Sequence, residues 1–151
     1  MDYTFDIALK TRTLFYKILE TLTLDHLNKK PEGFNNTIFW NIKHVVITQQ
    51  FLTYKLSELP VLVSEAEIET YKKGTKPEGK ATIEDLELLK SQLFSTLEKT
   101  KEDYQKGLFK KYTAYTVSTK STLTNIDEAL AFNNFHEGIH FGYILAMKKI
   151  R

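Results

Sequence analysis

The stretch TIEDLELLKSQLFSTLEKTKEDY, residues 82–104, carries the strongest helix signal in the chain. Thr82 provides a hydroxyl group for an N-cap, and Asp85, three residues later, forms an imperfect capping box with it. The apolar residues recur with the period of one helix face, at Leu86, Leu89, Leu93 and Leu97. No proline or glycine interrupts the stretch, so we expect a single long amphipathic helix.

Two segments nearer the N-terminus have the same apolar period. One covers residues 3–24, and its expected core face carries Ile7, Leu14, Ile18 and Leu22. The other covers residues 37–59. It follows Asn35 and Asn36, either of which suits an N-cap, and it stops before Pro60, which disfavours helix at the preceding residue.

A fourth helix is expected near the C-terminal end of the sequence. It begins near Thr124 or Asn125, and the acidic residues that follow are favourable in a first turn. Its end carries basic side chains, which suit a helix C-terminus, at Lys148, Lys149 and Arg151. Four helices and no strong strand pattern predict an all-α protein.

Two connections between these helices are long. Residues 60–81 are expected to hold a short helix at 65–71, and residues 106–123, rich in Thr and Tyr, an extended segment or short hairpin. The first connection can stretch about 70 Å, more than twice the roughly 30 Å of a 20-residue helix. It can therefore cross over along the molecule and leave the second and third helices parallel. We expect one domain over residues 1–151, folded as a four-helix bundle.

Composition excludes several classes of protein. The 151 residues carry a net charge of +2, from 21 basic and 19 acidic side chains, which gives no electrostatic case for nucleic-acid binding. The absence of cysteine excludes disulfides, thiolate metal sites and cysteine nucleophiles. No apolar run approaches the roughly 18 residues of a membrane span, and MDYTFDIALK lacks a signal-peptide pattern. We expect a cytoplasmic protein without nucleic-acid or membrane partners.

The segment FHEGIHFGY, residues 135–143, contains the H-E-x-x-H motif of zinc proteases at His136, Glu137 and His140. Metzincins continue with a glycine and a third histidine, but tyrosine and alanine occupy those positions here. No histidine or carboxylate follows His140, so the downstream ligand of other zincins is also missing. We therefore disfavour a protease and expect Glu137 to be solvated or ion-paired.

His136 and His140 share one helix face, with β-carbons about 6 Å apart, and can converge on one metal ion. On their own, however, the two histidines favour a structural role in which each forms a hydrogen bond in the core. His44 favours the metal, because it is the polar residue in an otherwise apolar stripe over residues 40–51. It lies about 11 Å from the start of its helix, and His140 about 14 Å from the end of its own. If these helices are antiparallel, the three histidines lie at one level.

Three neutral imidazoles suit zinc, nickel, copper or iron. Three protein ligands with an open fourth position are typical of catalytic rather than structural zinc sites. A divalent ion in such a site lowers the pKa of a bound water or thiol. We therefore predict a divalent-metal site formed by His44, His136 and His140, with zinc or nickel as the ion, acting on a small-molecule substrate.

The sequence also resembles the DinB-like (YfiT-like) superfamily of metal-dependent proteins. The resemblance is carried by the histidine within NNTIFWNIKHVVITQQFL and by the H-x-x-x-H of HEGIHFGYI, with KPEGFNNTIFWNIKH and YKKGTKP as further matches. It implies an up-down-down-up bundle, often a homodimer, with His44, His136 and His140 as metal ligands. It also implies transfer of a low-molecular-weight thiol in some members. One departure is Tyr143, where members often carry Gln.

Some alternatives remain open at this stage. The protein is either a metal-dependent thiol transferase or hydrolase, or a non-enzymatic small-molecule-binding or stress-response dimer with structural histidines. Gly138 and Gly142 allow close approach of a helix or subunit, and packing within one chain is favoured. Phe39, Trp40 and Phe51 line either a substrate pocket or the core, and the core is favoured.

Overall fold

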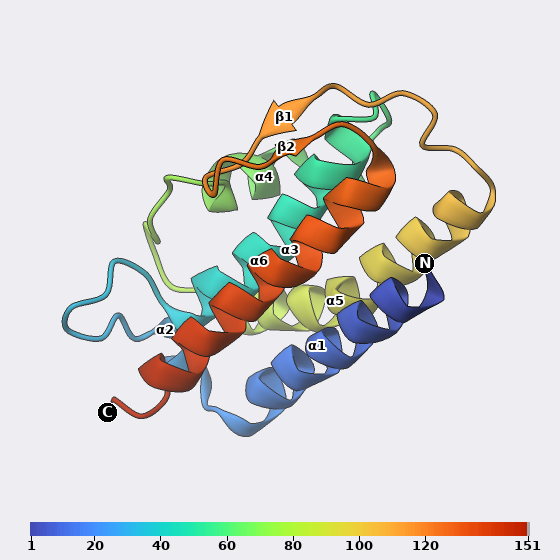
Figure 1. Cartoon of the computed structure of the whole chain (residues 1–151). Coiled ribbons are helices and arrows are strands. Elements are labelled where there is room, and N and C mark those ends of the chain that lie inside the picture. Colours follow the sequence, from blue (N-terminus) through green and yellow to red (C-terminus); the bar gives the residue numbers. More distant parts are fainter. Residues whose placement is uncertain (151) are drawn as a thin grey trace.

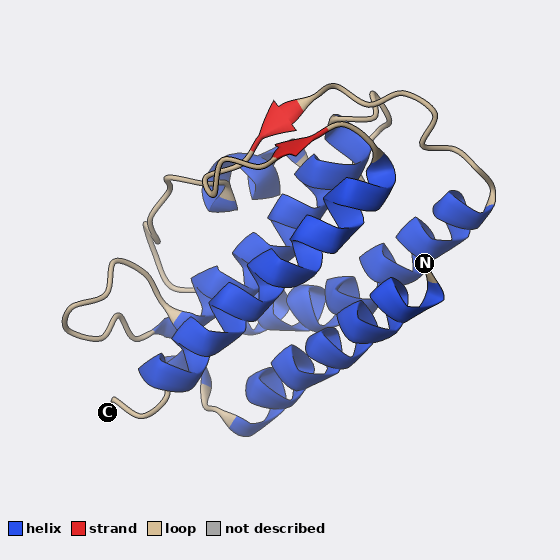
Figure 2. Cartoon of the chain, viewed as in Figure 1, coloured by secondary structure: helices blue, strands red, loops and turns tan. Residues whose placement is uncertain are grey.

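The computed structural model describes residues 1–150 and is mostly helical (Figure 1; Figure 2). Its elements are α1 (Asp2–Thr21), α2 (Leu24–Asn28), α3 (Ile38–Gln50), the π-helical turn η1 (Phe51–Lys55), α4 (Glu65–Tyr71), α5 (Ile83–Gln105), β1 (Tyr115–Thr116), β2 (Thr122–Leu123) and α6 (Ile126–Met147). The predicted all-α class is therefore confirmed.

Side-chain caps set the starts of the long helices. Thr82 and Asp85 form both arms of a capping box at the start of α5, as the sequence predicts. Asn125 caps α6 by accepting a hydrogen bond from the backbone N–H of Glu128. The prediction that Asn35 or Asn36 caps the second helix was wrong. Thr37 does so, because its hydroxyl accepts the Trp40 N–H at 3.0 Å.

The first helix differs most from its prediction. It ends at Thr21 because Leu22 is extended, and Thr23 caps the separate helix α2. The predicted core face was also wrong in part, since Ile7 and Leu14 are 38% and 42% exposed. The buried face instead carries Phe5, Ala8, Arg12, Phe15, Ile18 and Leu19. Arg12 interrupts this face with a charged residue, so the face is not recognised from the spacing of apolar residues alone.

The remaining helices follow their patterns more closely. All four leucines of the predicted α5 stripe are buried: Leu86, Leu89, Leu93 and Leu97. Helix α3 continues through η1, where the N–H of Leu56 donates to the carbonyl of Phe51. Helix α6 ends at Met147, so the expected extension through the basic residues was too long. Lys148 is its C-cap, and Arg151 lies outside the described residues.

The two long connections contain the expected local structure. Helix α4 lies within residues 60–81 and packs on α3. Strands β1 and β2 lie within residues 106–123 and pair antiparallel, with Tyr115 opposite Leu123. In Figure 1 the hairpin lies beside the start of α6. Its residues Val117 and Leu123 share an apolar cluster with Leu52 of η1. α4, the hairpin, α3 and α6 therefore surround one region of the molecule.

Each of the four long helices, α1, α3, α5 and α6, packs on two of the other three. Helix α1 packs on α5 and α6, and α3 also packs on α5 and α6 (Figure 1). Within residues 1–150, no helix combines the length and the apolar character that crossing a membrane requires. The pairing of α3 with α6 brings His44 and the H-x-x-x-H pair onto facing helices.

Candidate metal centre

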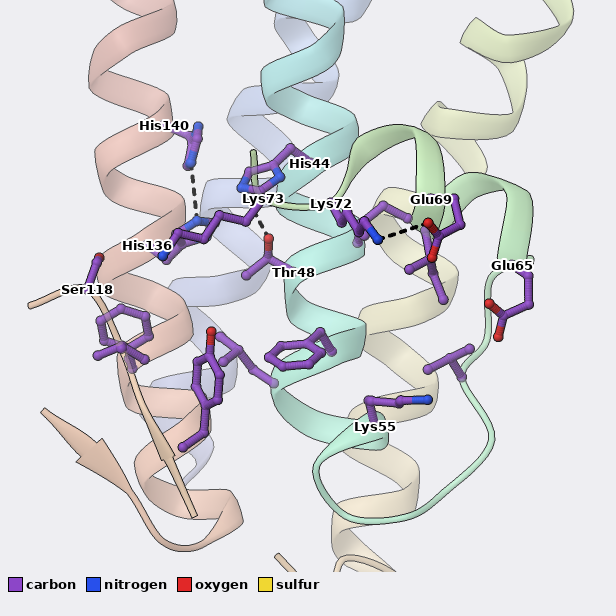
Figure 3. A pocket seen from close by; sticks show the side chains of 18 of the residues that line it. His44, Thr48, Lys55, Glu65, Glu69, Lys72, Lys73, Ser118, His136 and His140 are labelled. Carbon is purple, nitrogen blue, oxygen red and sulfur yellow. Dashed lines mark hydrogen bonds and ion pairs between the residues drawn. The ribbon is translucent and has the colours of Figure 1, made fainter. Parts of the chain in front are cut away.

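The structure brings together three of the four histidines. His44 comes from α3, and His136 and His140 come from successive turns of α6 (Figure 3). One nitrogen atom of each ring lies within 4.8 Å of one nitrogen of each of the others. His26, in α2, is not part of this group.

Hydrogen bonds fix the orientation of two of the rings. His44 Nδ1 lies 2.7 Å from the backbone carbonyl of Tyr71. A carbonyl oxygen only accepts hydrogen bonds, so Nδ1 carries the proton and Nε2 keeps a lone pair. Metal-binding histidines commonly have their second nitrogen oriented in this way.

His140 is held in the same way by Asn41. Its Nδ1 lies 2.7 Å from Asn41 Oδ1. The Asn41 amide nitrogen donates to Asn36 Oδ1 and to the Thr37 carbonyl, which fixes the amide so that its oxygen faces His140. The Nδ1–H of His140 is therefore the donor, and its Nε2 also keeps a lone pair.

His136 has no arrangement that satisfies both of its ring nitrogens. Its Nε2 lies 3.2 Å from the Nε2 of His140, and its Nδ1 is buried without a hydrogen-bond partner. A proton on Nε2 leaves Nδ1 without a donor, and a proton on Nδ1 leaves two lone pairs facing each other. Such an unsatisfied buried group costs about 1–3 kcal/mol. A cation on Nε2 removes the second conflict, so this donor set fits a divalent metal ion.

The electrostatic environment keeps these rings neutral. Burial lowers the pKa of all three histidines. Repulsion from the neighbouring rings lowers the pKa of His136 and His140 further, whereas the hydrogen bond to Tyr71 offsets part of the lowering for His44. The pKa of His136 falls to about 3 and that of His140 to about 4. At neutral pH the imidazoles are therefore in the unprotonated form that binds metals.

Two side chains beside His44 complete its surroundings. Trp40 stacks on the His44 ring, with centroids 4.5 Å apart and planes 10° apart. Thr48 Oγ1 lies 3.2 Å from His44 Nε2, and the hydroxyl donates because that nitrogen has a lone pair. Thr48 was not predicted from the sequence, although its position four residues after His44 places it on the same helix face.

The histidines line a pocket of about 890 Å³ (Figure 3). Its walls come from α3, η1, α4, the hairpin and α6. The walls are largely apolar, including Ile47, Phe51, Leu52, Val61, Ile68 and Phe132. A volume of this size accommodates a small organic molecule. Phe51 thus lines the pocket, whereas Phe39 and Trp40 are buried in the core.

A model of the DinB superfamily matches residues 8–144, a range that contains all three histidines. The chain belongs to the DinB superfamily. The family resemblance that the sequence predicts is therefore confirmed. A search of curated proteins gave no match for this chain.

In this DinB-superfamily chain, Glu137 is fully buried and forms an ion pair with Arg12. Its two carboxylate oxygens accept hydrogen bonds from Arg12 Nε at 2.8 Å and Arg12 Nη2 at 3.0 Å. Asn133 Nδ2 adds a third at 2.6 Å. The expectation that Glu137 is solvated or paired holds only in its second part, and its partner is an arginine of α1.

Gly138 and Gly142 face solvent. A β-carbon built on either residue would have no neighbour within 4 Å among the described residues. The expectation that these glycines allow close packing within the chain was therefore wrong. The space they leave lies on the outer surface of α6.

Proposed function

We propose that this protein is a divalent-metal-dependent enzyme in which His44, His136 and His140 hold the ion. The proposal rests mainly on the convergence of three neutral imidazoles, one of them unsatisfied, at the wall of a pocket of about 890 Å³. Zinc or nickel is the expected ion. When bound, such an ion supplies a Lewis acid that lowers the pKa of a water or thiol.

The residues of the chain itself prepare the site. Tyr71 and Asn41 orient two ligand rings, so little reorganisation is needed when a cation binds. The Thr48 hydroxyl lies beside a ligand nitrogen and can hydrogen-bond a substrate. The apolar walls of the pocket exclude water from the apolar part of a bound substrate. The reaction that we propose is transfer of a low-molecular-weight thiol to a small molecule, or hydrolysis.

We also propose that the four long helices form an up-down-down-up bundle. Support comes from their pairwise contacts, in which α1 and α3 each pack on both α5 and α6. The crossover between the second and third long helices would be residues 60–81, which contain α4.

A homodimer through the outer face of α6 is a further part of the proposal. Between Ala129 and Met147 the helix has one charged residue, Glu137, and that residue is buried. The exposed residues in this span are apolar, aromatic or small: Ala131, Phe135, Gly138, Ile139, Gly142, Tyr143, Leu145 and Ala146. A second copy can lie against this face isologously. Light scattering after chromatography should give a dimer for wild type, a monomer for Phe135→Glu, and a dimer for Leu88→Glu on α5.

A second candidate function is non-enzymatic binding of a small molecule by a dimer with structural histidines. The observation that favours it is the burial of Glu137 against Arg12. The carboxylate that acts as base in H-E-x-x-H enzymes is thereby kept out of the pocket. This candidate predicts ligand binding without turnover.

The enzyme proposal is tested on protein purified without a nickel column and then loaded with zinc or nickel. Thiol transfer is assayed with glutathione or cysteine and an aryl chloride, and hydrolysis with a nitrophenyl ester. We expect metal-dependent turnover that is lost in His140→Gln and kept in His26→Gln, the histidine outside the group. Metal binding without turnover in any of these assays would favour the second candidate, and absence of metal binding would overturn the site.

A further inference from the structure

The backbone around Lys73 is anchored from both sides to α3. On one side, the Tyr71 carbonyl accepts the hydrogen bond from His44. On the other, Thr75 Oγ1 accepts a hydrogen bond from Trp40 Nε1 at 3.2 Å. Since Trp40 stacks on His44, both anchors lie at the histidine group.

The residues between these anchors form a tight turn. The Thr75 N–H donates to the Lys72 carbonyl at 3.1 Å, and the Thr75 hydroxyl donates to the same oxygen at 2.7 Å. Gly74 has φ +87°, a conformation that glycine adopts without strain. The position of the Lys73 backbone is thus determined by the same contacts that orient His44.

The Lys73 side chain borders the pocket. In Figure 3 it extends toward His136, and both residues line the same cavity. Its neighbour Lys72 pairs with Glu69 at 2.8 Å. None of the ion pairs formed among residues 1–150 involves Lys73, so its charge is available to a ligand.

We infer that Lys73 binds the anionic group of the substrate, and that the substrate is a small, largely apolar molecule with one negative charge. Apolar walls receive the body of the molecule, and Lys73 holds its charged end beside the histidines. An ammonium group at the edge of an apolar pocket attracts an anion more strongly than one surrounded by water. The inference rests on the proposed function, because it concerns the same site.

The test uses Trp40, the only tryptophan in the chain, as a fluorescent reporter beside the site. Octanoate serves as an apolar anion and octanol as its uncharged counterpart. Each is titrated into metal-free and zinc-loaded protein. We expect wild type to bind octanoate more tightly than octanol, because only octanoate pairs with Lys73.

Matched variants isolate the charge at position 73. Lys73→Gln should weaken octanoate binding about fivefold or more and change octanol binding less than about twofold. Lys73→Arg, which keeps the charge, should stay close to wild type. Lys76→Gln, an exposed lysine outside the pocket, should bind both probes as wild type does. Melting temperatures of all variants should match, since these side chains are exposed.

Three results would overturn the inference: no octanoate binding at millimolar concentration, equal affinity for octanoate and octanol, or an unchanged affinity in Lys73→Gln. The outcomes also separate this inference from the proposed function. Dependence on Lys73 without any zinc binding would keep the anion site and overturn the metal-dependent enzyme. Zinc binding without any dependence of octanoate affinity on Lys73 would keep the metal site and overturn the anion site.

Discussion

His136 and Glu137 are neighbours on α6, and they differ in how well the hydrogen bonds of their side chains are satisfied. Glu137 is fully buried, and Arg12 and Asn133 satisfy both of its carboxylate oxygens. His136 lines a pocket and has one buried nitrogen without a partner. Successive residues of an α-helix are rotated by about 100° about the helix axis. Glu137 therefore faces the core, whereas His136 faces the cavity. A satisfied group in the core holds helices together, whereas the convergence of His136 with His44 and His140 at a cavity indicates a ligand.

Arg12 completes the satisfied group. Its Nη1 donates to the Leu93 carbonyl at 2.9 Å and to Thr96 Oγ1 at 3.3 Å, which links α1 to α5 as well as to α6. One atom in this group lacks a donor, the side-chain oxygen of Asn133. Nearly all hydrogen-bonding atoms around the Arg12–Glu137 pair therefore have partners. We expect that breaking this pair lowers the stability of the fold, whereas changing the histidines weakens metal binding.

The largest expected effect follows from removing Arg12. Arg12→Met leaves the Glu137 carboxylate buried without its partner, and should lower the free energy of unfolding by about 3–5 kcal/mol. Arg12→Met combined with Glu137→Met should cost less, because no charge stays buried. Urea unfolding measures both. A loss below about 1 kcal/mol in the single variant would contradict a structural role for the pair.

Zinc should stabilise the folded protein by binding to the three histidines. At a free zinc concentration 100 times its dissociation constant, the gain is about 2.7 kcal/mol, which raises the melting temperature of a chain of this size by about 5–10 °C. His136→Gln should lose this gain, and His26→Gln should keep it. Differential scanning calorimetry of metal-free and zinc-loaded samples measures the shift. Equal shifts in the two variants would contradict the comparison.

A smaller effect is expected from Asn41, which orients His140 without belonging to the group of three histidines. Asn41→Leu removes the acceptor for the His140 Nδ1–H, and should weaken zinc binding about 10–100-fold, the usual effect of losing such a partner. Competition with a chromophoric chelator measures the affinity. Asn134→Leu on α6, where Asn134 donates to the Thr4 carbonyl away from the pocket, is the matched control. An unchanged affinity in Asn41→Leu would show that the hydrogen bond does not prepare the site.

The smallest effect concerns Glu67, which ties α4 to the rest of the molecule. Burial raises the pKa of Glu67, but hydrogen bonds from Lys43, the Ser64 N–H and Gln92 outweigh it and lower that pKa to about 2. Burial also lowers the pKa of Lys43, which offsets part of the gain from the pair. Glu67→Gln should therefore cost only about 1 kcal/mol of unfolding free energy at pH 7.

The pH dependence of this difference has a definite sign. Because the folded pKa of Glu67 is depressed from 4.5, its contribution is complete above about pH 4.5 and is lost as the pH falls through about 2. The gap between wild type and Glu67→Gln in urea unfolding should close over that interval. A gap that widens on acidification would contradict the assigned pKa direction.

Much of the fold was predictable because helix caps and apolar period are local signals. The capping box at Thr82 and the N-cap at Asn125 fix the starts of two long helices. The first helix was predicted poorly, since Arg12 occupies a core position and Ile7 is exposed. An arginine enters the core only with a distant partner, in this case Glu137, and one sequence gives no sign of that pairing.

The candidate site was predictable only in its histidines. The four-residue spacing on α6 and a single polar residue in an apolar stripe were enough to select them. The orienting acceptors were not visible, because Tyr71 contributes a backbone carbonyl, which every residue has. Lys73 was also missed, since one lysine among many gains its meaning from the turn that holds it beside the pocket.

The central claim is that His44, His136 and His140 together hold one divalent metal ion. The most direct measurement is the zinc content of untagged protein, purified without a nickel column, incubated with zinc and dialysed. Elemental analysis should give about one zinc per chain for wild type and for His26→Gln, and far less for His44→Gln and His140→Ala. Wild type without stoichiometric metal, or equal metal in His44→Gln, would contradict the claim.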